Sequence, residues 1–200
     1  MKLWLLVPVK PFGEGKSRLA DVLAQDARAA LSREMLARVL DQAQAAEVLA
    51  GTIVISRDQN ALAQARLAGV ESIPETGQDL NLALIEASQQ AMRHATEAIL
   101  VLPADLPLVT AADIRQLYTL GATQAGVVIA PSPDGGTNAL LLRPPHAIQF
   151  SFGRDSFARH HQLAATAGVP IQVFTSPTLA FDVDRPEDLA SLQRLIATGM

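Results

Sequence analysis

The chain has 200 residues with 49% hydrophobic and 18% charged side chains, no cysteine, and a formal net charge of −4. This composition predicts one globular domain over residues 1–200 and excludes a disordered chain. The lack of cysteine excludes disulfides, thiolate zinc and cysteine nucleophiles, and the acidic balance argues against nucleic-acid binding. The apolar N-terminal run is too short for a signal core or a membrane span, so we expect a cytoplasmic protein without membrane contact.

Apolar, β-branched runs alternate with amphipathic stretches of helical spacing. In chain order these patterns predict a strand at 3–9, a helix within 17–47, a strand at 52–56, a helix at 59–68, a weaker strand at 70–73, a helix at 80–94, a strand at 98–102, a helix at 111–120, a strand at 126–130, a weaker strand at 137–142, a helix at 156–167, a weaker strand at 171–174 and a helix at 186–196. Such alternation predicts an α/β fold with a mostly parallel sheet covered on both faces. Ligands are then expected at the loops beyond the carboxyl ends of the strands.

The loop after the first predicted strand gathers positive charge. Two of the three lysines in the chain, Lys10 and Lys16, stand there with Arg18. The end of this loop imitates a P-loop, but Lys10 stands where that motif requires glycine. Three cations at a helix start predict a polyphosphate site, and the alternative is that Lys16 and Arg18 are solvated residues of a first helical turn. Asn81, in the first turn of the helix predicted at 80–94, is a weaker candidate for contact with a base or ribose.

Carboxylates follow two later segments. Asp105 stands just beyond the strand at 98–102, where a carboxylate suits Mg²⁺ that also holds substrate phosphates. The alternative is that Asp105 caps the next helix, although Thr110 with Asp113 three residues later already matches a capping box. Asp182 and Asp184 share one face if their segment is extended, so either can supply a second carboxylate. Asp184 can instead be the N-cap of the last helix.

Two glycine-containing segments, at 131–140 and 152–157, complete the candidate loops. An anion-binding nest is predicted from Thr137, Asn138, Ser156 and the backbone N–H groups beside Gly136 and Gly153. The alternatives are a hairpin turn in the first segment and a loop hinge in the second. His160 and His161 lack the helical spacing of a zinc motif, so we do not predict them as metal ligands.

The order of these motifs resembles that of the guanylyltransferases of deazaflavin coenzyme F(420) biosynthesis. The segments VPVKP, GKSRL, DLN, LPADLPL, APSPDGGTNALLL, FGRDSF and AFDVDRPEDL carry the resemblance, and GGTNAL and FGRDSF are its most specific parts. The resemblance implies a single-domain three-layer sandwich, a Rossmann fold of the nucleotide-diphospho-sugar-transferase type. It also implies transfer of GMP from GTP to a phosphorylated three-carbon acid, with release of pyrophosphate. That acid is phosphoenolpyruvate in bacterial relatives, 2-phospho-L-lactate in archaeal ones and 3-phosphoglycerate in a further variant.

The resemblance also assigns roles to residues of this chain. Thr137, Gly153 and Ser156 match the acid site of the family. Asp105 matches its metal aspartate, and Asp184 matches the second metal ligand of the wider nucleotidyltransferase fold. Mg²⁺ is therefore the expected cofactor.

The expected chemistry agrees with the residues present. A phosphate monoester is largely ionised at neutral pH, so the attacking group needs no general base. Positioning and charge neutralisation then supply catalysis, from Lys10, Lys16, Arg18 and Asp105, with Lys16 and Asn81 at the nucleotide. The rival interpretations are a molybdopterin or sugar-phosphate nucleotidyltransferase and a non-catalytic nucleotide-binding module of the same fold.

Overall fold

A sheet with strand order β3-β2-β1-β4-β6-β5-β7 organises the computed structural model, which describes residues 1–197 and the side chains of residues 1–195. The strands are β1 (Leu3–Val9), β2 (Leu49–Ser56), β3 (Glu71–Pro74), β4 (Ala98–Val101), β5 (Gly126–Pro131), β6 (Thr137–Arg143) and β7 (Ile171–Val173). Within the described chain β6 alone runs antiparallel to its neighbours. The predicted mostly parallel sheet is confirmed.

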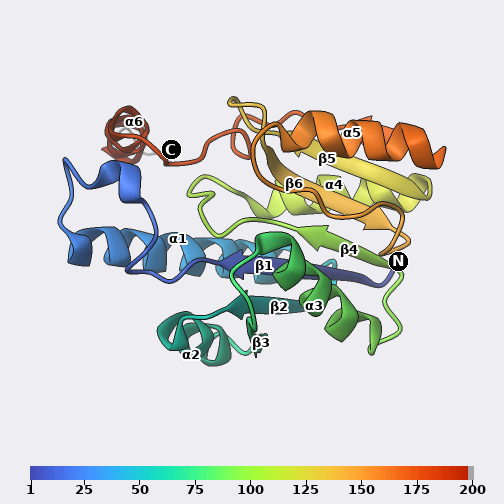
Figure 1. Cartoon of the computed structure of the whole chain (residues 1–200), viewed down its shortest axis with the longest axis horizontal. Coiled ribbons are helices and arrows are strands. Elements are labelled where there is room, and N and C mark those ends of the chain that lie inside the picture. Colours follow the sequence, from blue (N-terminus) through green and yellow to red (C-terminus); the bar gives the residue numbers. More distant parts are fainter. Residues whose placement is uncertain (198–200) are drawn as a thin grey trace.

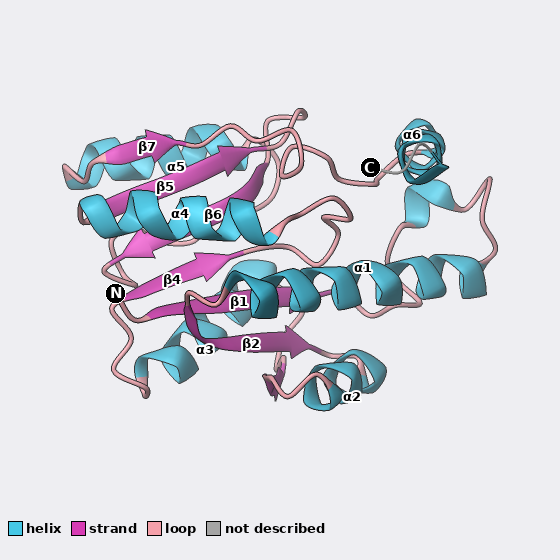
Figure 2. Ribbon diagram, turned by 180° about the vertical axis from the view of Figure 1, so that it is seen from behind, coloured by secondary structure: helices cyan, strands magenta, loops and turns pink. Residues whose placement is uncertain are grey.

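Helices cover both faces of this sheet (Figures 1 and 2). One layer holds α1 (Gln25–Ala46), α2 (Gln59–Leu67) and α4 (Ala111–Thr123), and the other holds α3 (Leu80–Met92) and α5 (Ser156–Ala167). Successive residues of β1 point to opposite faces, so Leu5 joins the first core layer and Leu6 the second. Both are fully buried, which explains the continuous apolar run in the sequence. No helix in the described part of the chain is long and apolar enough to cross a membrane.

The helix predicted within 17–47 is wrong at its start. A short 3₁₀ helix, η1 (Ser17–Leu19), precedes a loop, and α1 begins only at Gln25. Leu19 packs with Met35 of α1 and with Leu192 of α6 (Pro186–Ala197). Leu19 is therefore apolar because the turn folds back onto two helices, and not because it continues α1. Figures 1 and 2 show α6 beside this turn, so a segment near the start of the chain packs against the last helix.

Local capping explains other helix starts. The Thr110 side chain caps α4 by accepting from the Asp113 N–H. The Asp113 carboxylate accepts in turn from the Thr110 N–H at 2.9 Å, which confirms the predicted capping box. Asp79 caps α3 by accepting from the N–H groups of Asn81 and Leu82. The segment with Gly135 is the hairpin between β5 and β6, so the hairpin interpretation is also correct. Asp105 has no part in these caps, so the interpretation of Asp105 as the cap of α4 is wrong.

Candidate active site

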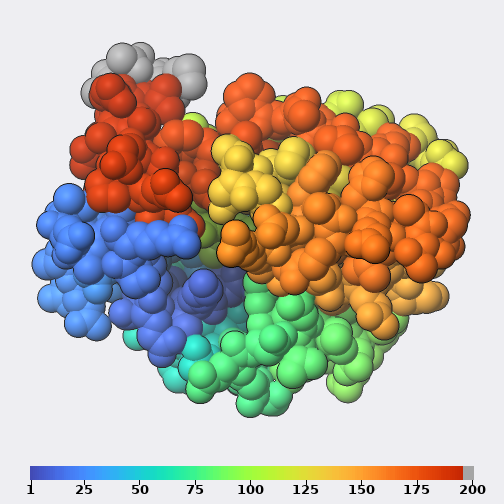
Figure 3. All heavy atoms as spheres, turned by 45° about the horizontal axis from the view of Figure 1, so that its top comes forward, coloured from blue at the N-terminus to red at the C-terminus, as the bar shows by residue number. Residues whose placement is uncertain are grey.

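A cleft of about 560 Å³ opens at the carboxyl edge of the sheet. The loops after β1, β2, β3 and β4 line it, together with the β5–β6 hairpin, the first turns of α3 and α5, and the segment before α6. Figure 3 looks onto this hollowed face, between N-terminal residues in blue, α3 in green and the α5 region in orange. Among the predicted site residues, Lys10 lines the cleft from its exposed position, whereas Arg18 and Asn81 lie outside the lining.

Lys16 lies between two carboxylates in this cleft. Its Nζ donates to Asp105 Oδ2 at 2.9 Å and to Asp184 Oδ1 at 3.1 Å, and its side chain is 6% exposed. Burial lowers the pKa of Lys16, but the two carboxylates outweigh burial and raise that pKa above its usual value. The alternative interpretation of Lys16 as a solvated helix residue is therefore wrong. Lys16 adopts a left-handed backbone conformation, with φ of 55°, just before η1.

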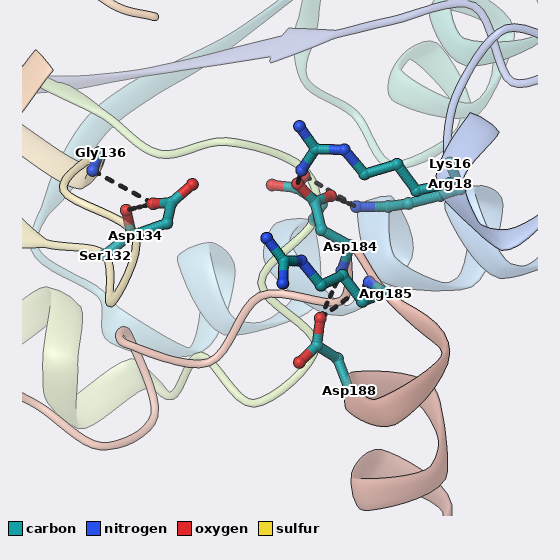
Figure 4. A network of polar contacts seen from close by, with 9 residues as sticks. Lys16, Arg18, Ser132, Asp134, Gly136, Asp184, Arg185 and Asp188 are labelled. Atoms are coloured by element: carbon teal, nitrogen blue, oxygen red, sulfur yellow. Dashed lines mark hydrogen bonds and ion pairs between the residues drawn. The ribbon is translucent and has the colours of Figure 1, made fainter. Parts of the chain in front are cut away.

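The second carboxylate reaches Lys16 from the other end of the chain. Arg18 Nη1 also contacts Asp184, at 3.4 Å, from a side chain that is 64% exposed. Asp188 of α6 accepts from the N–H groups of Asp184 and Arg185, which leaves the carboxylate of Asp184 to the two cations. Figure 4 shows Lys16 and Arg18 on one side of Asp184 and Asp188 on the other.

The donor set at this point fits Mg²⁺. Two carboxylates already converge on one cation, the Nζ of Lys16. Mg²⁺ takes one or two protein carboxylates and completes its shell with water and substrate phosphates. Among the side chains of residues 1–195, no group of three or more His, Cys, Asp or Glu is placed to hold a metal ion. Asp182 lines the same cleft, and burial, with Asp105 and Asp184 nearby, raises its pKa to about 6.

Buried hydroxyl groups form the opposite end of the cleft. Ser156 Oγ donates to Thr137 Oγ1 at 3.0 Å, and the Nδ1 of His160 lies 3.2 Å from the same oxygen. The Ser151 N–H donates to His160 Nε2 at 3.0 Å, so Nε2 carries no proton and the neutral ring must hold its proton on Nδ1. Thr137 Oγ1 thus accepts two hydrogen bonds, and its own hydroxyl proton is left for another acceptor.

The backbone beside these hydroxyls is shaped by a loop that depends on Gly153. Gly153 has φ of +117°, a conformation that favours glycine, and its carbonyl accepts from the Ser156 N–H at the start of α5. Asn81 anchors this loop because its amide accepts from the Phe152 N–H at 2.7 Å and donates to the Phe152 carbonyl at 3.3 Å. The predicted contact of Asn81 with a nucleotide stays a prediction, and the structure gives its amide a positioning role.

The carboxylate of Asp134 is tied to its own hairpin. Its Oδ1 accepts from the Ser132 hydroxyl and from the Gly136 N–H (Figure 4). The Ser132 hydroxyl, together with the Gly136 N–H, lowers the pKa of Asp134 against the opposing effect of burial. The hairpin therefore has an ordered tip beside Thr137.

Comparison with known proteins adds the deciding observation, because residues 3–196 match the family model described as guanylyl transferase, CofC like. The chain belongs to this guanylyltransferase family. A relative from Rubrobacter xylanophilus named phosphoenolpyruvate guanylyltransferase is 43% identical, covering 96% of this chain and 94% of its own. Another of that name from Chloroflexus aggregans is 40% identical, covering 92% and 94%. The resemblance in the motifs is confirmed, and the chain is a nucleotidyltransferase.

Solved structures confirm the fold of this guanylyltransferase. A putative nucleotide-diphospho-sugar transferase from Desulfovibrio desulfuricans superposes with a TM-score of 0.80 at 18% identity, covering 100% of this chain and 90% of its own. A nucleotidyl transferase from Methanothermobacter superposes with a TM-score of 0.69 at 14% identity, covering 99% of each chain. The predicted Rossmann-type sandwich is therefore correct.

Some residues of the guanylyltransferase cleft were missed by sequence reasoning. Sequence reasoning considered His160 only as a zinc ligand. The ring is buried behind Thr137 rather than in the cleft lining, and its contact with Thr137 comes from the folding of α5 against the hairpin. Glu75 and Arg57 do line the cleft. Ligand-binding side chains are expected just beyond the carboxyl ends of strands, and Glu75 stands at that position after the weak strand predicted at 70–73.

Proposed function

We propose that the protein transfers GMP from GTP to phosphoenolpyruvate and releases pyrophosphate, as the names of its relatives suggest. The observation that supports this most is the pairing, in one cleft, of a lysine–carboxylate centre with a hydroxyl-lined pocket. The first suits a nucleoside triphosphate with Mg²⁺, and the second suits a small phosphorylated acid. The product would serve coenzyme F(420) biosynthesis, the expected role of the family.

Asp105 and Asp184 would hold Mg²⁺, with Lys16 moving from these carboxylates onto the triphosphate. The bound ion supplies charge neutralisation at the α-phosphate and the departing pyrophosphate. Lys10, at the cleft rim, and Arg18, beside Asp184, extend the positive charge along the path of the triphosphate.

The acid pocket would bind and orient the acceptor. The hydroxyl proton of Thr137 is free to donate to an acceptor oxygen because both acceptor positions of Oγ1 are used. The Gly153 N–H and the positive end of the α5 dipole, at Ser156, add to this pocket. A phosphate oxygen of the acid then attacks the α-phosphorus, and no side chain has to remove a proton first.

The reaction is tested by following pyrophosphate release from GTP with Mg²⁺ and, separately, phosphoenolpyruvate, 2-phospho-L-lactate and 3-phosphoglycerate. We expect release with phosphoenolpyruvate, and release with only one of the other acids would reassign the acceptor. If none of the three acids gives pyrophosphate release in a protein that still binds GTP, the non-catalytic nucleotide-binding module is favoured instead.

The metal site is tested with Asp105→Asn, which keeps the size of the side chain and removes its charge. We expect turnover to fall about 100-fold or more, the loss typical of a removed charge-stabilising group. Asp21→Asn, at an exposed position outside the cleft, is the matched control and should keep full activity. Normal turnover by a folded Asp105→Asn protein would remove Asp105 from the metal site.

A further inference from the structure

Glu75 presents an incompletely paired carboxylate to the cleft, two strands away from the triphosphate loop. Its side chain is only 12% exposed, and the Arg57 Nε that pairs with it lies 3.7 Å from Oε2, beyond hydrogen-bonding distance. Within the described residues no donor hydrogen-bonds to this carboxylate. A largely buried carboxylate without a hydrogen-bond donor is stabilised when a ligand brings N–H donors to it.

Hydrogen bonds fix the backbone of the segment that carries Glu75. The Glu75 N–H donates to the Ser56 carbonyl at 3.0 Å, which ties it to the end of β2. The next residue, Thr76, is held by Glu86 of α3, which accepts from both its N–H and its hydroxyl. Burial raises the pKa of Glu75, and the acidic side chains Glu86, Asp79 and Glu14 add to that rise against the opposing effect of Arg57. The site is therefore rigid and rich in acceptors.

The surrounding wall suits a flat aromatic ring. Pro8 of β1, Ile55 of β2, and Leu80 and Ala83 of α3 line the cleft on the side of β3. Neighbouring strands lie about 4.8 Å apart, so the end of β3 is about 10 Å from the end of β1, where the triphosphate loop begins. That span suits a nucleoside with its phosphates at β1 and its base at β3.

We infer that Glu75 selects guanine by accepting hydrogen bonds from the N1–H and the exocyclic amine of the base. Guanine is the common base that presents these two donors side by side, whereas adenine and cytosine present a ring-nitrogen acceptor that a carboxylate repels. Asn81, the candidate from the sequence, has its amide committed to Phe152 and lies outside the cleft lining. This inference rests on the proposed use of GTP.

The test compares three triphosphates that differ at position 2 of the purine: GTP with an amine, ITP with hydrogen and XTP with a carbonyl, which also changes the protonation of N3. Equilibrium dissociation constants are measured without acceptor for the wild type and for Glu75→Gln. We expect the wild type to prefer GTP over ITP by about 10- to 100-fold, the factor of a hydrogen bond to a charged acceptor. In Glu75→Gln this preference should fall close to one, and XTP should gain affinity because the new amide can donate to its carbonyl.

Glu14→Gln is the matched control. Glu14 also lines the cleft and accepts from the same Arg57, at 3.0 Å, but its side chain is 61% exposed. This variant makes the same change of charge beside the same arginine, so the GTP to ITP ratio should stay as in the wild type. An equal change in both variants would show that charge at Arg57, rather than contact with the base, sets the preference.

An unchanged order of GTP, ITP and XTP in a folded Glu75→Gln protein would overturn the inference, and so would a wild type that binds GTP and ITP equally. Because these are binding ratios, they are independent of the acceptor. Failure of the proposed function appears separately, as tight GTP binding without pyrophosphate release in the presence of any of the three acids.

Discussion

The buried imidazole of His160 predicts a specific loss of stability in acid. Burial, and secondarily the charge of Arg159, lowers the pKa of His160 from 6.5 to about 4. The ring is fully buried, accepts from the Ser151 N–H through Nε2 and donates to Thr137 through Nδ1. A second proton on the ring would break the contact with Ser151 and leave a charge in the core.

The sign and size of the effect follow from proton linkage. Between pH 6.5 and about 4 the unfolded chain binds a proton at His160 that the native protein does not, so stability is full above this range and falls as the pH falls through it. At about 1.4 kcal/mol for each pKa unit, the whole effect is about 3 kcal/mol. About 2 kcal/mol of it is lost between roughly pH 7.5 and pH 5.

Urea unfolding of the wild type and His160→Gln at several pH values in this range measures the effect. Glutamine does not titrate, and its side-chain oxygen can still accept from Ser151. The variant is expected to be the less stable protein at neutral pH, and the difference in free energy of unfolding should shrink by about 2 kcal/mol on acidification. The pKa of Asp182 is raised to about 6, so its contribution to the free energy of unfolding changes with pH in the opposite direction. This contribution is the same in both proteins and cancels from their difference.

The neighbouring His161→Gln is the control, because His161 is exposed and its variant should follow the wild-type profile. A stability difference between wild type and His160→Gln that stays constant across the pH range would refute the assignment of a neutral, buried ring.

Two further predictions concern stability alone. Asp113 is buried and accepts from the Thr110 N–H and from the hydroxyls of Thr110, Ser176 and Thr178, so Asp113→Ala should lower the free energy of unfolding by about 2–4 kcal/mol; a loss below about 0.5 kcal/mol in urea titrations would contradict this network. Gly126 has φ of +151°, and an added Cβ would lie 2.4 Å from the carbonyl oxygen of Pro170, which also accepts from the Val127 N–H. Gly126→Ala should therefore lower the free energy of unfolding by about 1–3 kcal/mol and lower Tm by several degrees in calorimetry. An unchanged Tm would show that the backbone at Pro170, before β7, can shift without cost.

Several elements of the fold could be predicted from short-range sequence patterns alone. Both alternating faces of β1 are buried, so the run from Leu3 to Val9 reads as an interior strand without knowledge of its neighbours. The capping box at Thr110 is equally local, since the two partners are three residues apart. The position of Asp105 beyond β4 follows from the strand ending before it. Each of these features depends on short-range geometry, which the order of residues specifies directly.

The composition of the site was decided by tertiary structure. Lys16 and Asp184 are 168 residues apart, and they meet because α6 packs its Leu192 against Leu19 of the N-terminal turn. The same turn occupies the start of the predicted long helix, so α1 begins late, since periodic apolar residues do not distinguish a continuous helix from a chain that folds back. No spacing rule could reveal these contacts.

The roles of His160 and Asn81 likewise depend on contacts between distant segments. The hydrogen bonds of His160 reach Thr137 across 23 residues, and Asn81 is committed to Phe152 across 71 residues. The sequence by itself determined which residues can carry charge or hydrogen bonds and at which strand ends they stand. Packing of the helices against the sheet decided which of those groups face one another, because partner choice is set by three-dimensional proximity and burial.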